Sequence, residues 1–190
     1  EYPERIKGYY SFNPQDNTPV KEITDAFLQH PGYIGIKLLP DYHRTRLSDS
    51  AYKPVLLFAN KHNMLVLSHT WGGFMNNENC DNAKEVESVL SDYPNIRFIM
   101  GHSIQGQTDA AIELAICYPN AYLDLCDTGR INGIIEKMVR RAGAKKVLFG
   151  TDLPMQSTLY VLGAVKNAEI TEKQRRLILR DNALRILSEV

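Results

Sequence analysis

Short apolar runs alternate with longer amphipathic segments along most of the chain. The apolar runs are rich in β-branched and aromatic residues and predict strands over residues 6–12, 33–39, 65–68, 96–100, 122–125 and 147–150. The amphipathic segments predict helices over residues 20–29, 50–61, 83–91, 108–117, 132–142, 156–167 and 171–188. Strands that are apolar throughout and alternate with helices are typical of a parallel sheet covered on both faces.

Helix-terminating and helix-starting residues support several of these boundaries. Pro94 disfavours helix in the residue before it and ends the helix over 83–91. Arg141 and Gly143 suit the last turn and the C-terminus of the helix over 132–142. Thr171 is followed three residues later by Gln174, which is a capping-box pattern and predicts that the last helix begins there.

Two parallel architectures fit this alternation, a doubly wound open sheet and a (β/α) barrel. The Gly-x-Gly-x-x-Gly signature of the first does not follow the opening strand. Polar residues instead follow one strand after another, and in a barrel all these strand ends meet at one face. The predicted fold is therefore α/β, a (β/α) TIM-type barrel, in a single domain spanning residues 1–190.

The polar residues at these strand ends are capable of chemistry. They are Lys37, His69, His102, Asp124 and Asp152. Taken singly, each has a plainer interpretation: a histidine in a loop, an aspartate in a turn or N-cap, a solvated lysine. Together, two imidazoles and a carboxylate form the nitrogen-and-oxygen ligand set of a zinc, manganese or iron site. Because all of these residues follow strands that end at one face of the barrel, we favour a metal site over the separate, plainer interpretations.

Composition argues against several classes of protein. The 22 basic and 22 acidic residues balance, so no net field favours nucleic acid or an anionic membrane. The apolar runs are too short to span a bilayer, and the start does not resemble a signal peptide. The three cysteines fit no disulfide framework, and Cys117 and Cys126 are interpreted as small core residues. We expect a cytoplasmic protein with a small-molecule substrate; a homo-oligomer stays open.

The motifs around these residues resemble those of the amidohydrolase superfamily, in its amidohydrolase-related branch of metal-dependent hydrolases and decarboxylases. The resemblance covers essentially the whole chain and follows the family's order of strands three to eight and closing helix. The motifs are Tyr9-Tyr10-Ser11-Phe12-Asn13-Pro14, Gly35-Ile36-Lys37-Leu38, Leu67-Ser68-His69-Thr70, Phe98-Ile99-Met100-Gly101-His102-Ser103, Tyr122-Leu123-Asp124-Leu125, Leu148-Phe149-Gly150-Thr151-Asp152-Leu153-Pro154 and Asn182-Ala183-Leu184-Arg185-Ile186-Leu187.

The resemblance implies roles for three residues. His69 would be a metal ligand, and Asp152 would bind metal and accept a proton from the metal-bound water. His102 would bind a second metal or polarise the water and the substrate. The implied cofactor is a divalent metal, zinc with manganese or iron as alternatives, which lowers the pKa of a bound water from 15.7 to roughly 7. The implied reaction is hydrolysis of a small amide, ester or lactone, with non-oxidative decarboxylation of a small carboxylate as the alternative.

Three residues are candidates for substrate binding: Lys37, Trp71 and Arg130. Arg130 could clamp a carboxylate, since guanidinium and carboxylate pair in a fork geometry; a surface cation near a helix start is the plainer interpretation. Trp71 opens the run Trp71-Gly72-Gly73-Phe74 and could form an aromatic pocket wall, although a glycine-rich turn explains the run as well.

One part of the family's pattern is absent from the sequence. The family's first strand ordinarily supplies a His-x-His pair, and no two of the five histidines here are separated by one residue. A full barrel takes about 250 residues, and this chain starts just before the third-strand motif. We expect strands 3–8 of a barrel without strands 1–2, trimmed from a longer enzyme. Completion by another polypeptide or by dimerisation stays open, as does a non-catalytic remnant with a binding role.

Overall fold

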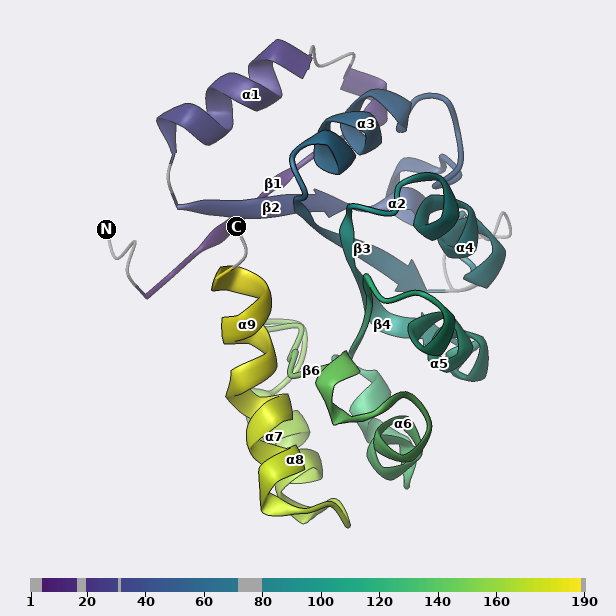
Figure 1. The fold of residues 1–190 in the computed structure, drawn as a ribbon, viewed down its shortest axis with the longest axis vertical. Helices are drawn as coiled ribbons and strands as arrows, with labels where there is room; N and C mark the ends of the chain where they lie inside the picture. The colour runs from purple at the N-terminus through teal and green to yellow at the C-terminus, as the bar shows by residue number, and fades with distance from the viewer. Residues whose placement is uncertain (1–4, 17–19, 31, 72–79, 189–190) are drawn as a thin grey trace.

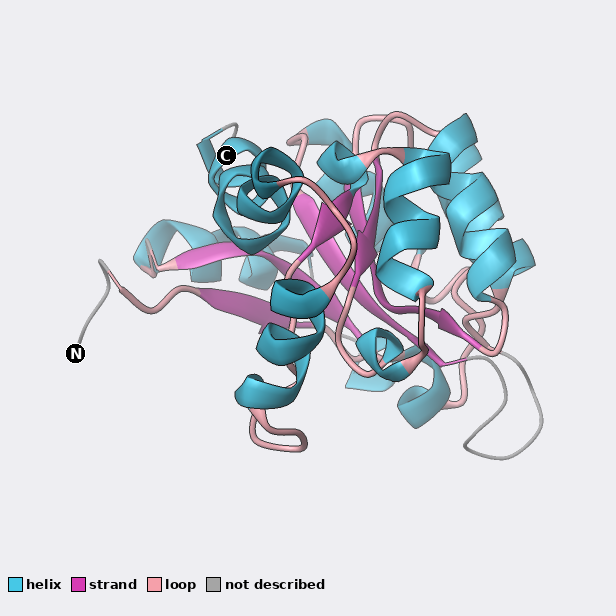
Figure 2. Ribbon diagram, turned by 90° about the horizontal axis from the view of Figure 1, so that it is seen from below, coloured by secondary structure: helices cyan, strands magenta, loops and turns pink. Residues whose placement is uncertain are grey.

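The computed structural model describes residues 5–16, 20–30, 32–71 and 80–188, and its centre is one parallel sheet. The sheet order equals the chain order, and every neighbouring pair of strands is parallel. The strands are β1 Gly8–Ser11, β2 Tyr33–Leu38, β3 Leu65–Trp71, β4 Arg97–Gln105, β5 Ala121–Asp124 and β6 Val147–Leu148. Figure 1 follows them from purple β1 to green β6, and Figure 2 shows the sheet surrounded by helices.

Helices follow each strand and cover the sheet on its outer side. Those packed along the outer face are α1 Val20–Gln29, α3 Lys53–Lys61, α4 Ala83–Asp92, α5 Thr108–Cys117 and α6 Ile134–Ala142 (Figure 1). After the last strand come α7 Thr158–Asn167, α8 Glu172–Arg176, a π-helical segment Leu177–Asp181 and α9 Asn182–Ser188. Shorter elements are α2 Pro40–His43 and the 3-10 turns Pro14–Asp16, Thr128–Arg130 and Ala144–Lys146.

Alternate residues of the strands are buried on opposite faces of the sheet. On the outer face, Ile36, Val66 and Phe98 join the large core formed with the helices. On the inner face, Leu65 and Ile99 belong to a second, smaller cluster; its other buried members are Tyr122, Leu148 and Ile186. Both faces exclude water, which explains why the strands read as continuous apolar runs. The presence of Ile186 shows that α9 packs against the inner face.

Two polar anchors hold α9 in this place. The side chain of Asn182 is fully buried, and its amide nitrogen donates to the carbonyl oxygens of Ala144 (2.7 Å) and Val147 (2.8 Å). At the other end of the helix, the guanidinium of Arg97 donates to the carbonyl oxygen of Ile186. The closing motif of the sequence therefore attaches the last helix to the sheet.

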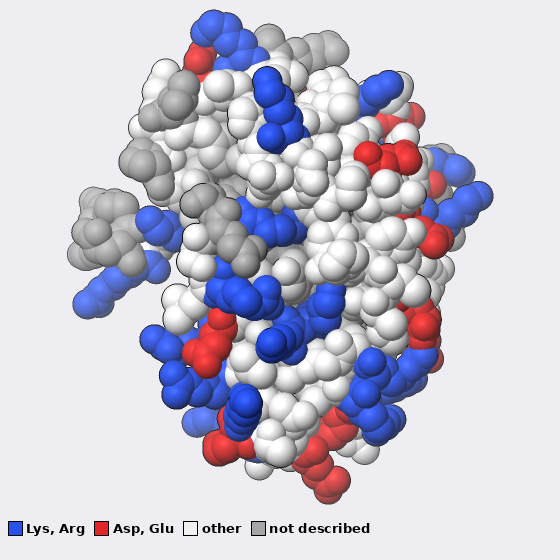
Figure 3. Space-filling view, viewed as in Figure 1, with Lys and Arg blue, Asp and Glu red and all other residues white. Residues whose placement is uncertain are grey.

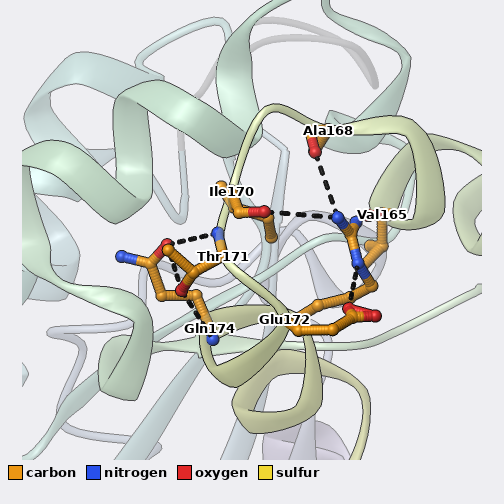
Figure 4. Close-up of polar contacts among 7 residues, drawn as sticks. Val165, Ala168, Ile170, Thr171, Glu172 and Gln174 are labelled. Atoms are coloured by element: carbon orange, nitrogen blue, oxygen red, sulfur yellow. Dashed lines mark hydrogen bonds and ion pairs between the residues drawn. The ribbon is translucent and has the colours of Figure 1, made fainter.

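A third anchor fixes the turn between α7 and α8. The Arg175 guanidinium donates to the backbone carbonyl oxygens of Val165, Ala168 and Ile170 and to the Glu172 carboxylate (Figure 4). These bonds satisfy carbonyl groups that the end of a helix leaves without partners. The predicted capping box is confirmed in the same view: the Thr171 hydroxyl accepts from the backbone of Gln174, whose side chain accepts from the backbone of Thr171.

The predicted helices and strands are found, but some of them begin or end at other residues than predicted, and two of these differences affect the site. Both α1 and α5 have the predicted bounds, whereas β3 and β4 run past their predicted ends to Trp71 and Gln105. These two strands pair beyond residue 68, with His69 opposite Gly101, so that His69 and His102 lie within strands and not after them. The predicted helix over 171–188 is divided by its π-helical segment, and Cys117, predicted in the core, is exposed at the end of α5.

The sheet has β1 and β6 at its edges in the described part of the chain. A complete TIM barrel closes eight strands, and the described residues form six. The predicted fold class, an incomplete TIM-type barrel, is confirmed. On the face shown in Figure 3, acidic and basic side chains are interspersed around the lower and right-hand edges. Among the described helices, none has both the length and the apolar character needed to cross a membrane.

Candidate active site

A cavity of about 300 Å³ lies on the inner face of the sheet, at the carboxyl ends of the strands. Its polar wall contains Lys37, His102, Asp124, Cys126 and Asp152. Its apolar wall includes Tyr9, Leu67, Ile99, Phe149 and Ile186. Four of the five polar residues at predicted strand ends therefore share one cavity, as the barrel prediction requires.

Two residues that line the cavity, Gly101 and Gly150, have neighbours too close for any side chain. A Cβ on Gly101 would lie 2.6 Å from the carbonyl oxygen of Ser68, so β3 and β4 meet there without room for a side chain. A Cβ on Gly150 would overlap the Oδ1 atom of Asp124. The second residue after β6 must therefore be glycine for the Asp124 carboxylate to occupy its place in the wall.

The backbone that carries His102 is strained. His102, Ser103 and Ile104 have φ values of 64°, 46° and 50°, in a region that non-glycine residues rarely adopt. Hydrogen bonds hold the segment: the Thr128 hydroxyl donates to the carbonyl oxygen of His102, and the backbone N–H of Ile104 donates to the Thr70 hydroxyl at 3.0 Å. Such strain persists only where the surroundings enforce it, and it is concentrated at functional sites.

A chain of three polar side chains sets the protonation of His102. The Cys126 thiol donates to Oδ2 of Asp124 at 2.7 Å, and its sulfur lies 3.3 Å from Nδ1 of His102. Burial raises the pKa of the thiol, so that it keeps its proton. Because that proton is directed at Asp124, the sulfur accepts from Nδ1–H, and we assign the lone pair of His102 to Nε2.

The charges of the cavity follow from burial. Burial lowers the pKa of His102 below its usual 6.5, despite the neighbouring Asp124 and Asp152, so its imidazole is neutral at pH 7. Burial also lowers the pKa of Lys37, and these two carboxyl groups oppose that shift. The pKa of Asp124 is raised by burial. The cavity thus combines a neutral imidazole, a buried lysine and two carboxyl groups.

His69 lies beside this cavity and belongs to a second group. Of the His, Cys, Asp and Glu side chains that the structure describes, one set of three brings a ligand atom from each within 4.8 Å of the others: Asp41, His69 and Asp81. The predicted set of His69, His102 and Asp152 does not meet that distance, although the rings of His69 and His102 touch with centroids 4.8 Å apart. His69 is therefore common to the predicted site and to the group that is observed.

The ionisation of this second group is shifted strongly. Burial, followed by His102 and Lys37, lowers the pKa of His69 to about 3, so its imidazole is neutral. Burial and the neighbouring Asp41 raise the pKa of Asp81 to about 7, against the backbone amides of Trp71 and Asp81 and against Lys37. A neutral imidazole beside two carboxyl groups is chemically suited to a divalent metal.

The three predicted substrate-binding residues occupy different places. Lys37 lines the cavity. The Trp71 ring meets the edge of His102 with centroids 4.7 Å apart, although the residues that follow it, 72–79, lie outside the described part of the chain. Arg130 is half exposed and ion-pairs with Asp127 at 3.2 Å, away from the cavity lining.

Sequence reasoning did not identify Asp41, Asp81 or the polar role of Cys126. Asp41 comes three residues after the end of β2, so the rule that identified the other strand ends applies to it. Asp81 follows a segment with no readable pattern. Cys126 was interpreted as a core residue, and it is buried, but its thiol has two polar partners.

Solved structures resemble the chain over nearly its whole length. A TIM-barrel protein from Bordetella bronchiseptica is 22% identical with a TM-score of 0.83, over 99% of this chain and 68% of that one. A 2,6-dihydroxybenzoate decarboxylase from Rhizobium is 15% identical with a TM-score of 0.74, over 98% and 72%. A manganese-bound dihydroxybenzoic acid decarboxylase from Polaromonas is 14% identical with a TM-score of 0.69, over 96% and 69%.

Sequence comparison gives the family. No curated protein sequence matches the chain. The family model described as amidohydrolase matches residues 1–188, almost every residue of the 190. The chain therefore belongs to the amidohydrolase family.

Proposed function

We propose that the chain carries the active site of a metal-dependent hydrolase that acts on a small amide, ester or lactone. The observation that supports this most is the neutral, buried His102, which lines the same cavity as Lys37 and Asp152. A base, a cation and a carboxylate in one cavity of about 300 Å³ are what hydrolysis of a small carbonyl compound needs.

His69 is the residue that fits a metal best. It is neutral, buried and fixed between the rings of Trp71 and His102, and one carboxylate oxygen each of Asp41 and Asp81 lies within 4.8 Å of a nitrogen of its ring. The family resemblance adds Asp152 and His102 to the predicted ligands. A divalent metal bound there would supply Lewis acidity and lower the pKa of a water molecule.

The chain's own residues would do the rest of the chemistry. The Lys37 ammonium would bind a carbonyl or carboxylate oxygen of the substrate. His102 would accept a proton at Nε2 from the attacking water and pass it to the leaving group, kept in orientation by Cys126. Tyr9, Leu67 and Phe149 would exclude water from the substrate.

Non-oxidative decarboxylation of a small aromatic carboxylate is the second candidate. The observation that favours it is the decarboxylase activity named for structures similar to this chain, on dihydroxybenzoates and on 5-carboxyvanillate. In that reaction Lys37 would bind the carboxylate in the cavity. His102 would take up a proton from water at Nε2 and deliver it to the ring carbon from which carbon dioxide leaves, and Asp152 is the alternative carrier of that proton.

A substrate panel with two product assays tests both candidates. The purified protein, loaded with zinc or manganese, is incubated with small esters, lactones, amides and hydroxybenzoates while acid release and carbon dioxide release are recorded. We expect turnover of one class, reduced about 100-fold or more by Asp152→Asn and by His102→Gln. Full turnover by Asp152→Asn would reject the assignment of this cavity.

A further inference from the structure

We propose that Asp127 and Gln156 are positioning residues, which hold the Asp152 carboxylate in a fixed place relative to the His102 imidazole. Neither of the two is among the residues that line the cavity, so both would act on a substrate only through the residues that they hold. Their effect on turnover rests on the proposed function, whereas the hydrogen bonds between them are a feature of the fold.

Asp152 lies in an irregular segment with little apolar packing. Residues 149–157 connect β6 to α7 without helix or strand, and Leu153 and Met155 are 68% and 80% exposed. Asp152 is itself exposed and has a φ of 56°, in a region that non-glycine residues rarely adopt. Such a conformation persists only where surrounding contacts enforce it. The place of the carboxylate therefore depends on the polar contacts of this segment.

Gln156 connects this segment to the turn after β5. Its backbone N–H donates to the carbonyl oxygen of Asp152 at 3.2 Å, and its side-chain amide donates to Oδ1 of Asp127 at 2.6 Å. A hydrogen bond to a carboxylate is stronger than one between two neutral groups. One residue thus contacts both the backbone of Asp152 and a group outside the segment.

Asp127 is a firmly held anchor for this bond. It is 3% exposed and, like Asp152, has a φ of 56°. Its Oδ2 forms an ion pair with Arg130 at 3.2 Å, and its carbonyl oxygen accepts from the Tyr160 hydroxyl of α7 at 3.2 Å. A buried carboxylate strongly favours such partners, because water does not reach it to replace them. The anchor therefore stays in place while the segment that it holds is exposed.

The neighbours of Asp127 in the same turn hold His102. The Cys126 sulfur lies 3.3 Å from Nδ1 of His102, and the Thr128 hydroxyl donates to the carbonyl oxygen of His102. The residues on either side of Asp127 thus hold the imidazole, while Asp127 itself holds the segment of Asp152. One turn sets the separation of the two groups, and a reaction that uses both depends steeply on that separation.

Hydrogen exchange tests the anchor without reference to turnover. Exchange in the peptide covering residues 149–157 is followed by mass spectrometry for the wild type, for Gln156→Leu and for the control Gln29→Leu, which changes an exposed glutamine at the end of α1. We expect exchange in this peptide to be about tenfold faster in Gln156→Leu, the equivalent of one hydrogen bond, and unchanged in the control. Equal exchange in all three proteins would overturn the proposal.

Reversal of the pair separates positioning from a general loss of structure. Gln156→Glu places a second carboxylate against Asp127 and should lower kcat about 10- to 100-fold, while KM stays within about threefold of the wild type. Asp127→Asn added to Gln156→Glu exchanges donor and acceptor, so the double variant should recover most of the lost kcat and the slow exchange. A wild-type kcat in Gln156→Glu, or a double variant no better than Gln156→Glu, would contradict the proposal.

The two readouts also separate this inference from the proposed function. Faster exchange in Gln156→Leu without any turnover by the wild type would reject the proposed function alone. Turnover that is lost in Asp152→Asn, with both exchange and kcat unchanged in Gln156→Leu, would reject this inference alone.

Discussion

The ring of His69 meets the ring of His102 edge to face, with the two centroids 4.8 Å apart and the planes at 77°. The imidazole of His69 lies beside two buried carboxyl groups, and that of His102 lines the cavity at the strand ends. Both are neutral because burial lowers their pKa values. The contact therefore joins a place suited to a cation with a place suited to an organic molecule.

Replacement of Cys126 should affect catalysis through His102. In Cys126→Ala, Nδ1 of His102 and Oδ2 of Asp124 both lose their partner, and kcat should fall about tenfold, the equivalent of one hydrogen bond. Cys126→Ser, whose hydroxyl both donates and accepts, should recover most of the loss. Cys117→Ala changes an exposed thiol and serves as the control. Wild-type kcat and an unchanged pH profile in Cys126→Ala would show that the thiol does not position the imidazole.

A methyl group at Gly150 should damage the cavity and the fold together. Its Cβ would overlap Oδ1 of Asp124, and overpacking of this kind costs about 1–3 kcal/mol. Gly150→Ala should lower the free energy of unfolding measured with urea. The matched control is Gly163→Ala in α7, where no atom lies within 4 Å of the added Cβ and alanine favours helix by about 1 kcal/mol. Equal stabilities for the two variants would contradict the close approach at Gly150.

The buried amide of Asn182 should be essential to the attachment of α9. Asn182→Leu removes two hydrogen bonds and leaves two carbonyl groups without donors, so we expect a loss of about 2–4 kcal/mol in the free energy of unfolding. Asn167→Leu removes an exposed amide that bonds within its own helix and should cost less than about 0.5 kcal/mol. A small, equal effect of both substitutions would mean that apolar packing alone holds the last helix.

Much of the fold was predictable, because central strands such as β4 and β5 are buried on both faces and helices such as α4 and α6 bury one apolar side. The strand-end rule also grouped Lys37, His102, Asp124 and Asp152, and these four residues line one cavity. The rule could not show that β3 continues to Trp71, since that depends on its pairing with β4.

The site was less predictable than the fold, because its partners are set by tertiary contacts. Asp81 lies near His69 through a tertiary contact that no strand-end pattern indicates. The role of Cys126 depends on its contacts with His102 and Asp124. The sequence around Cys126 gives no sign of these contacts. Arg130 has a sequence setting typical of a carboxylate clamp, yet its nearest acid is Asp127 of the same turn.

Stability should depend on pH through Lys146. Burial, with Arg185 nearby, lowers the pKa of Lys146 from 10.5 to about 8, although its ammonium donates to three backbone carbonyl oxygens. Between pH 8 and 10.5 the folded chain releases this proton while the unfolded chain retains it, so stability rises with pH in that window.

Lys146→Met isolates this effect. The free energy of unfolding of the wild type should rise relative to the variant as the pH increases from 8 to 10.5. The exposed neighbour Lys145, changed to methionine, should leave the pH dependence as in the wild type. A constant difference between the wild type and Lys146→Met across the window would show that the Lys146 pKa is not lowered by folding.

The most direct test of the account is the dependence of turnover on metal. The purified protein is stripped with a chelator, its metal content is measured, and turnover of the substrate found in the panel is followed as Mn²⁺ or Zn²⁺ is added back. We expect turnover to vanish on stripping and to return with one equivalent of metal in the wild type but not in His69→Asn. Undiminished turnover by protein shown to be free of metal would contradict the account.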